Sequence, residues 1–186
     1  MRIISGTYRG FRLRSLKGAS VRPTSDQMRE TLFDVLGPAI GGSRFLDGYA
    51  GSGAVGLEAL SRGAAQVVLV ESQRAAQDLI RRNLEALRAA DKVRLIGSKL
   101  EAALDRLAQE ATSFDYVFLD PPYAEIAAYH RVLRQLGRSP LLAPDSAVIA
   151  EHSRHVLLEA KYGTLDRRRE IRHGDTQLTL YHPSGS

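Results

Sequence analysis

The feature that most constrains the fold is an alternation of strand and helix patterns that begins at Arg44. Strands are predicted at 44–47, 66–71, 92–96, 114–119 and 146–151, with helices at 55–61, 73–90, 100–110 and 125–136 between them. Because strands such as Val67-Val68-Leu69-Val70 are wholly apolar, both faces of their sheet should be covered. We therefore expect an α/β fold with a mostly parallel sheet between helices.

Both ends of the chain depart from this alternation. Residues 2–14 combine β-formers with Gly6 and Gly10, which predicts a short hairpin. A helix should then start at Thr24 or Ser25, which are good N-caps, and end at Gly37-Pro38. At the other end, 163–171 and 176–181 flank a Gly-Asp pair and predict a closing antiparallel hairpin.

The positive charge of the chain is concentrated at its N-terminus. The net charge is +5, yet residues 1–25 alone hold six basic side chains and no acidic one. The remaining residues carry 20 basic against 21 acidic side chains. A local basic patch of this kind suits a polyanion such as nucleic acid, although a solvated basic tail would have the same composition.

Composition also excludes several chemistries. The chain contains no cysteine, so disulfides, thiolate metal sites and cysteine nucleophiles are absent. Its five histidines show no metal-ligand spacing, and no metal is expected. No apolar run reaches the roughly 20 residues that cross a bilayer, and the first residues lack the apolar core of a signal peptide. We expect a cytoplasmic protein without a membrane partner.

A glycine-rich loop follows the first strand of the alternation. It contains Gly51, Gly53 and Gly56 in a Gly-x-Gly-x-x-Gly pattern between a strand and a helix. Glycines at such a place allow a tight turn and let a ligand approach the backbone closely. Glu71 ends the next strand, 20 positions after Gly51, where an acid can accept hydrogen bonds from ribose hydroxyls.

The acid before the loop helps to distinguish two cofactor classes. The glycine pattern alone fits either a dinucleotide or S-adenosylmethionine. Asp47 stands at the end of the strand, where its carboxylate would repel a pyrophosphate but attract the ammonium and sulfonium of S-adenosylmethionine. The sequence thus favours the methyl donor, while an NAD-dependent oxidoreductase stays an alternative.

A second motif, Asp120-Pro121-Pro122-Tyr123, follows the strand predicted at 114–119. Two prolines fix the backbone and remove two donors, so the Asp120 carboxylate and the Pro121 carbonyl can present converging acceptors. Such acceptors suit an exocyclic base amine, because they localise the nitrogen lone pair and stabilise the charge that develops on nitrogen. Tyr123 could stack on the extruded base. A turn with a surface tyrosine would explain the motif equally in a chain without the glycine loop.

With both motifs in place, the chain resembles the RsmD family of small-subunit (16S) ribosomal RNA guanine-N2 methyltransferases. The resemblance spans essentially the whole chain and rests on 2–6, Arg22-Pro23-Thr24, 29–33, 46–64, Glu71, Asn83 and the Asp-Pro-Pro-Tyr motif. It implies a Rossmann-like S-adenosylmethionine-dependent methyltransferase fold with a seven-stranded sheet and a small N-terminal β-hairpin extension. It also implies S-adenosylmethionine as cofactor and, as partner, small-subunit rRNA within an assembling subunit that includes ribosomal proteins.

The resemblance assigns roles to particular residues. The methyl donor would be bound by Asp47, Tyr49, Ala50, Gly51, Ser52, Gly53, Glu71, Ser98, Leu100 and Asp120. Asp120, Pro121, Pro122 and Tyr123 would form the catalytic motif. The family often has an Asn or Asp after the third strand that could bind adenine. Here Lys99 stands beside Ser98 and cannot accept a hydrogen bond, so Ser98 or nearby backbone groups would serve instead.

The RNA-binding role falls on six arginines, namely Arg2, Arg9, Arg12, Arg14, Arg22 and Arg29. We expect residues 1–24 to form an RNA-binding extension and 25–186 the methyltransferase domain, in a monomer. Adenine-N6 methylation of DNA or RNA is the alternative activity, although 186 residues leave no room for a large target-recognition insert. A binding module without catalysis is a further alternative, against which the intact Asp120 and glycine loop argue.

Overall fold

The chain forms two units, Met1–Lys99 and Leu100–Ser186, in a computed structural model that describes residues 1–15, 26–122 and 125–185. The predicted division into 1–24 and 25–186 differs from these units and stays a prediction. None of the helices built from the described residues is long and apolar enough to cross a membrane.

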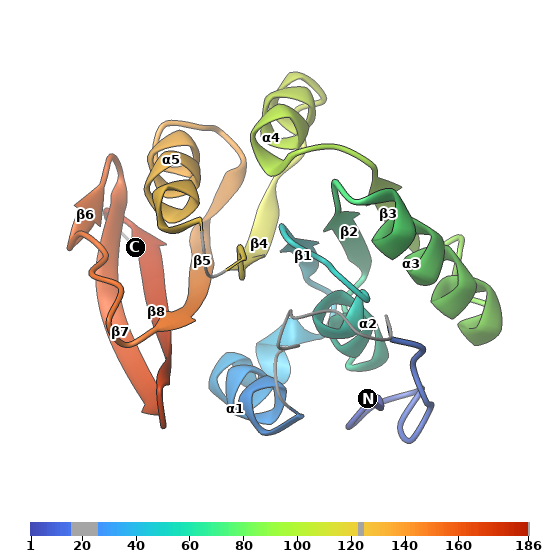
Figure 1. The fold of residues 1–186 in the computed structure, drawn as a ribbon. Coiled ribbons are helices and arrows are strands. Elements are labelled where there is room, and N and C mark those ends of the chain that lie inside the picture. The colour runs from blue at the N-terminus through green and yellow to red at the C-terminus, as the bar shows by residue number, and fades with distance from the viewer. Residues whose placement is uncertain (16–25, 123–124, 186) are drawn as a thin grey trace. The chain divides into compact units, whose positions relative to one another are not determined.

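The first unit has three parallel strands, β1 (Arg44–Asp47), β2 (Gln66–Val70) and β3 (Val93–Ile96). β2 lies in the middle and pairs with both neighbours. The helices are α1 (Asp26–Leu36), the short 3₁₀ helix η1 (Gly37–Ile40), α2 (Ala54–Ser61) and α3 (Arg74–Leu87). α2 packs against β1 and β2, and α3 lies next to β3 (Figure 1). This part of the alternation is as the apolar patterns predict.

The first 15 residues fold back on themselves in the antiparallel sense of the expected hairpin, although they form no regular strands. One antiparallel bridge joins Arg2 to Arg12, and the Ile3 amide donates to the Phe11 carbonyl at 3.0 Å. Ile3 and Leu13 are buried, so the loop is attached to the core of its unit by two apolar side chains. Two further backbone hydrogen bonds join the arms, from the Gly10 amide to the Ile3 carbonyl at 2.8 Å and from the Leu13 amide to the Met1 carbonyl at 3.1 Å. Gly6 and Gly10 have positive φ at the turns between them.

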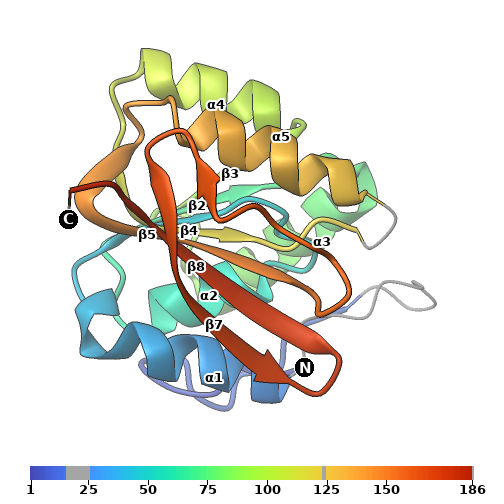
Figure 2. The same cartoon turned by 90° about the vertical axis from the view of Figure 1, so that its left-hand side faces the viewer.

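The second unit combines parallel and antiparallel strands. β4 (Phe114–Leu119) and β5 (Leu142–Ser153) are parallel, and β8 (Thr176–Pro183) pairs antiparallel with β5. β7 (Leu165–His173) then pairs antiparallel with β8. Helices α4 (Leu100–Gln109) and α5 (Ile126–Leu136) lie side by side on one face of these strands (Figure 2).

The C-terminal hairpin of β7 and β8 confirms the prediction, but the described residues form eight strands where seven were expected. The additional strand is β6 (Lys161–Tyr162), which is too short to leave a pattern in the sequence. β6 pairs with β7 only at Leu165 and Asp166. The rest of the outer edge of β7 carries exposed, mostly charged side chains.

A polar cluster lies within the core of the second unit. The Nδ1 of His152 is 2.8 Å from the Ser153 carbonyl, and its Nε2 is 2.8 Å from the Thr179 hydroxyl. Because a carbonyl can only accept, Nδ1 carries the proton and Nε2 accepts from Thr179. His152 is buried, and this burial lowers its pKa below the ordinary value of 6.5. The folded protein therefore holds a neutral histidine here.

Candidate functional site

The glycine loop runs from the end of β1 to the start of α2. The Ala50 amide donates to the Val70 carbonyl of β2 at 2.9 Å, and the Gly53 amide donates to the Ala50 carbonyl at 2.6 Å. Gly51 and Gly53 have φ of +54° and +81°, conformations that favour glycine. The loop is thus a defined turn at the carboxyl end of the parallel strands.

Asp47 is only 1% exposed and holds the helix that follows the loop. Its Oδ2 accepts the Gly56 amide at 3.0 Å, in the first turn of α2. Gly53, the N-cap of this helix, has no side chain to accept such a bond, so the preceding strand supplies the acceptor. A carboxylate is well placed at a helix N-terminus because the exposed amide dipoles there favour negative charge.

Gly56 and Gly51 of the motif have different structural roles. A Cβ on Gly56 would lie 2.2 Å from Leu69 Cδ2, so the bare backbone lets α2 pack closely on β2. A Cβ on Gly51 would meet no atom within 4 Å. Gly51 therefore faces open space, where a ligand can approach the backbone.

Glu71 supports the loop from the end of β2. Its Oε2 accepts the Gly51 amide at 2.8 Å, and its Oε1 accepts the Gln73 amide at 2.7 Å. The residue is half-buried. Each carboxylate oxygen can accept more than one hydrogen bond, so Glu71 can hold the loop and still accept from a ligand hydroxyl.

The other residues assigned to the methyl donor occupy varied environments. Tyr49 and Ser52 are half-buried in the glycine loop, and Ala50 is buried. The Ser98 hydroxyl donates to the Lys99 carbonyl at 3.1 Å. Leu100, the first residue of α4, is buried in the second unit. Their contacts with a cofactor stay predictions.

The catalytic motif begins directly after β4. Asp120 is half-buried, Pro121 is buried and Pro122 is exposed. The Glu125 amide donates to the Pro122 carbonyl at 2.8 Å, which closes a turn before α5. Tyr123 lies outside the described residues. β4 is parallel to β5, so Asp120 follows the carboxyl end of a parallel strand, as expected.

The arginines of the first segment are exposed, namely Arg2, Arg9, Arg12 and Arg14. Arg22 lies outside the described residues. Arg29 is different, because it is fully buried in α1. One of its nitrogens donates to the Arg2 carbonyl at 2.8 Å and to Asp26 at 2.9 Å. This burial does not suit the predicted phosphate contact, and the observed bonds instead connect α1 with the first segment.

Sequence reasoning missed the residues that hold this segment. Glu58 of α2 is fully buried and accepts the Ile4 and Ser5 amides at 2.7 and 3.0 Å. Ser61, also buried, accepts the Thr7 amide on its carbonyl and the Tyr8 amide on its hydroxyl. The signal was present, since a glutamate within the apolar run of α2 requires partners.

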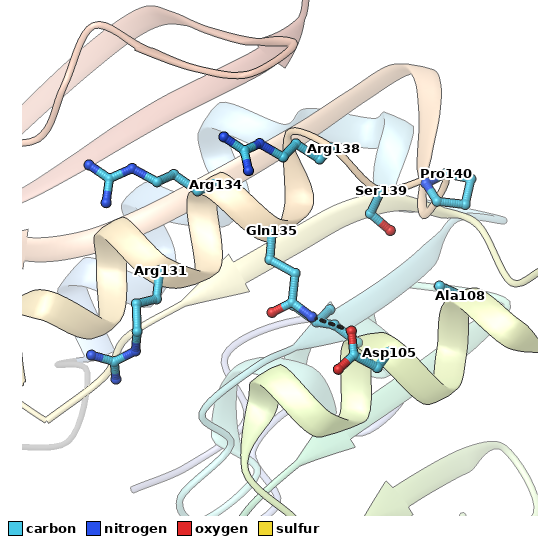
Figure 3. Close-up of a pocket in the computed structure, with 9 residues that line it drawn as sticks. Asp105, Ala108, Arg131, Arg134, Gln135, Arg138, Ser139 and Pro140 are labelled. Atoms are coloured by element: carbon cyan, nitrogen blue, oxygen red, sulfur yellow. Dashed lines mark hydrogen bonds between the residues drawn. The ribbon is translucent and has the colours of Figure 1, made fainter.

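A groove with a volume of about 510 Å³ lies between α4 and α5, and none of the predicted site residues lines it (Figure 3). Arg131 and Arg134 of α5 and Arg138, which follows this helix, line it, and Gln135 donates to Asp105 of α4 at 2.7 Å. Arg131 is paired with Glu101 at 3.2 Å. No group of three or more potential metal ligands gathers anywhere in the described part of the chain.

The sequence matches a protein-family model and several known proteins. A family model described as conserved hypothetical protein 95 matches residues 1–182. YlbH of Bacillus subtilis, provisionally an rRNA methyltransferase, is 36% identical over all of both chains. Ribosomal RNA small subunit methyltransferase D of Escherichia coli is 45% identical over 66% of this chain and 60% of its own length. The counterpart of Haemophilus influenzae is 39% identical over 81% of this chain and 78% of its own.

Solved structures agree with the architecture. The Escherichia coli protein yhhF has a TM-score of 0.85 at 35% identity and matches 100% of this chain and 99% of its own. An RNA methyltransferase of Salinibacter ruber, solved with S-adenosylhomocysteine, has a TM-score of 0.65 at 14% identity and matches 89% of this chain and 95% of its own. The fold is thus the Rossmann-like fold of methyltransferases.

Proposed function

Because the chain belongs to the RsmD family, whose model is the one described as conserved hypothetical protein 95, we propose that it methylates small-subunit ribosomal RNA. The donor is S-adenosylmethionine, and the acceptor is the exocyclic N2 amino group of a guanine. Relatives named as small-subunit rRNA methyltransferases support the substrate class. Residue chemistry supports the finer assignment.

The glycine loop fits the donor. Gly51 offers an open approach to its backbone, and half-buried Glu71 can accept from a ribose hydroxyl beside it. Asp47, directly before the loop, contributes a negative charge. This charge attracts a cationic ligand and repels a pyrophosphate. When bound, S-adenosylmethionine supplies an electrophilic methyl group. The loop residues hold and orient it at the carboxyl ends of the strands, where ligands bind in open α/β sheets.

The observation that carries the proposal is the turn at Asp120, Pro121 and Pro122 directly after β4. Asp120 and the Pro121 carbonyl accept the two hydrogens of the target amine, which localises the nitrogen lone pair. They also stabilise positive charge on nitrogen as it attacks. The exposed arginines of the first segment bind backbone phosphates and so contribute affinity rather than base choice.

The test uses undermethylated small ribosomal subunits and radiolabelled S-adenosylmethionine, followed by digestion of the RNA to nucleosides. Label should appear in N2-methylguanosine. Asp120→Asn should lower the rate by about 10²-fold or more, since it removes the charge that stabilises the amine. Asp145→Asn, which neutralises an exposed acid of the same unit, is the matched control and should leave the rate unchanged.

Other outcomes redirect the proposal. Label in N6-methyladenosine would preserve the role of Asp120 and overturn the guanine assignment. No label on subunits, naked rRNA or DNA would overturn the enzymatic assignment if S-adenosylhomocysteine still raises the melting temperature.

A further inference from the structure

Asn83 of α3 joins the first segment to the glycine loop. Its side-chain oxygen accepts the Arg14 amide at 2.9 Å. Its side-chain nitrogen donates to the Ser52 carbonyl at 3.1 Å and to the Arg14 carbonyl at 3.3 Å. The residue is 1% exposed, so these bonds are shielded from water. All three residues belong to the first unit.

The three bonds use the particular chemistry of an amide. An asparagine side chain has one acceptor oxygen and two donor hydrogens. Here the oxygen meets an N–H group, and the two hydrogens have two carbonyl oxygens to meet. An aspartate would keep the acceptor for Arg14 but would direct a carboxylate at the Ser52 and Arg14 carbonyls. Asparagine is therefore specifically suited to bridge these two segments.

The bridge connects the segments with the two proposed binding roles. Ser52 stands between Gly51 and Gly53, the positive-φ glycines of the loop, so its carbonyl shares the conformation of that loop. Arg14 is the last arginine in residues 1–15, which we call the arginine segment. Glu58 and Ser61 attach the other part of this segment to α2, the helix that begins directly after the loop. Both attachments thus lead to the glycine loop.

We infer that Asn83 is a positioning residue that couples occupation of the glycine loop to RNA binding by the arginine segment. The inference rests on the proposed function. A ligand that fixes the loop also fixes the Ser52 carbonyl, and through Asn83 it fixes the backbone of Arg14. Coupling of this kind is reciprocal, so RNA bound to the arginines strengthens cofactor binding by the same factor.

The coupling factor is measured directly. Binding of undermethylated small subunits is determined with and without S-adenosylhomocysteine, for the unmodified protein and for Asn83→Asp. We expect S-adenosylhomocysteine to tighten subunit binding about 5-fold or more in the unmodified protein, the lower end of typical couplings. In Asn83→Asp the factor should fall to about one.

A destabilised control separates coupling from general damage. Leu79→Ala removes a buried side chain of the same helix but leaves the amide in place. It should lower the melting temperature and keep the coupling factor. If Asn83→Asp weakens both ligands but retains the factor of the unmodified protein, Asn83 is merely structural and the inference is overturned.

A second measurement needs no variant. Asn83 is the single asparagine of the chain, so labelling with ¹⁵N-asparagine gives one side-chain NH₂ pair in the NMR spectrum. The pair should shift on titration with S-adenosylhomocysteine and, separately, with a small-subunit rRNA fragment. A pair that responds to only one ligand, or to neither, overturns the coupling. Failure of the protein to bind or methylate subunits at all would instead remove the proposed function, and the inference with it.

Discussion

The carboxylate of Asp47, at the end of β1, accepts the backbone amide of Gly56 at 3.0 Å and thereby caps α2 from a neighbouring strand. Asp47→Ala should lower the free energy of unfolding by about 1–2 kcal/mol, the usual range for a lost cap. Asp47→Asn retains an acceptor and should cost less. Urea denaturation measures both, and equal losses would show that the hydrogen bond is not the source of the stability.

Gly6 and Gly10 form a matched pair for testing how the first segment is attached. Both have φ near +80°, but a Cβ on Gly6 would lie 1.8 Å from the Ser61 carbonyl oxygen, whereas one on Gly10 meets nothing within 4 Å. Gly10→Ala should therefore cost only the backbone strain of about 1–2 kcal/mol. Gly6→Ala should also displace the segment from α2.

Hydrogen exchange of the Ile4, Ser5, Thr7 and Tyr8 amides reports this displacement. Their exchange should accelerate strongly in Gly6→Ala and little in Gly10→Ala, because these amides donate to Glu58 and Ser61. Similar exchange in the two variants would contradict the close packing of Gly6 on Ser61.

The exposed arginines should give RNA binding a characteristic dependence on salt. A phosphate contact contributes about 0.7–0.9 to the slope of log affinity against log salt concentration. Arg12→Ala should therefore reduce this slope by about that amount. Arg138→Ala, which removes an exposed arginine just after α5, is the control and should leave the slope unaltered. Equal reductions would indicate attraction by net charge alone.

The buried histidine should make stability depend on pH. Burial lowers the pKa of His152 in the folded protein, so below about pH 6.5 the unfolded chain binds this proton more readily. The free energy of unfolding should therefore fall as the pH drops from 7 to 5. His182, whose pKa is also lowered by burial, acts in the same direction. His152→Gln should show a shallower decline in denaturation series, and an unchanged decline would assign the effect elsewhere.

The sequence predicted what periodicity and motif order encode. Apolar runs located β1 to β5, and Asp47, Glu71 and Asp120 stand at or directly after the ends of strands, as predicted. Contacts between residues far apart in the sequence could not be predicted from it. A glutamate within the apolar run of α2 indicates that Glu58 needs partners, but nothing in the sequence identifies them as Ile4 and Ser5, more than 50 positions away.

Arg29 illustrates the same limit at a charged residue. It is predicted to bind RNA with the N-terminal arginines, or else to pair on the surface with a neighbouring acid, yet α1 turns it into the interior. Its direction depends on the Arg2 carbonyl and on Asp26, and only the first of these is remote in sequence. β6 was not predicted for another reason: a strand of two residues is too short to show the alternation of apolar and polar side chains that indicates a strand.

The outer edge of β7 has a consequence for the behaviour of the protein in a crowded cell. β6 covers this edge at Leu165 and Asp166, and the Arg167 amide donates to the Ala160 carbonyl at 2.9 Å. Beyond these residues stand Arg168, Arg169 and Arg172. An open strand edge is a template on which other chains can aggregate. Although Glu170 offsets part of this charge, a second copy that approaches this edge would bring arginines close to arginines, so we expect these side chains to disfavour strand-to-strand association.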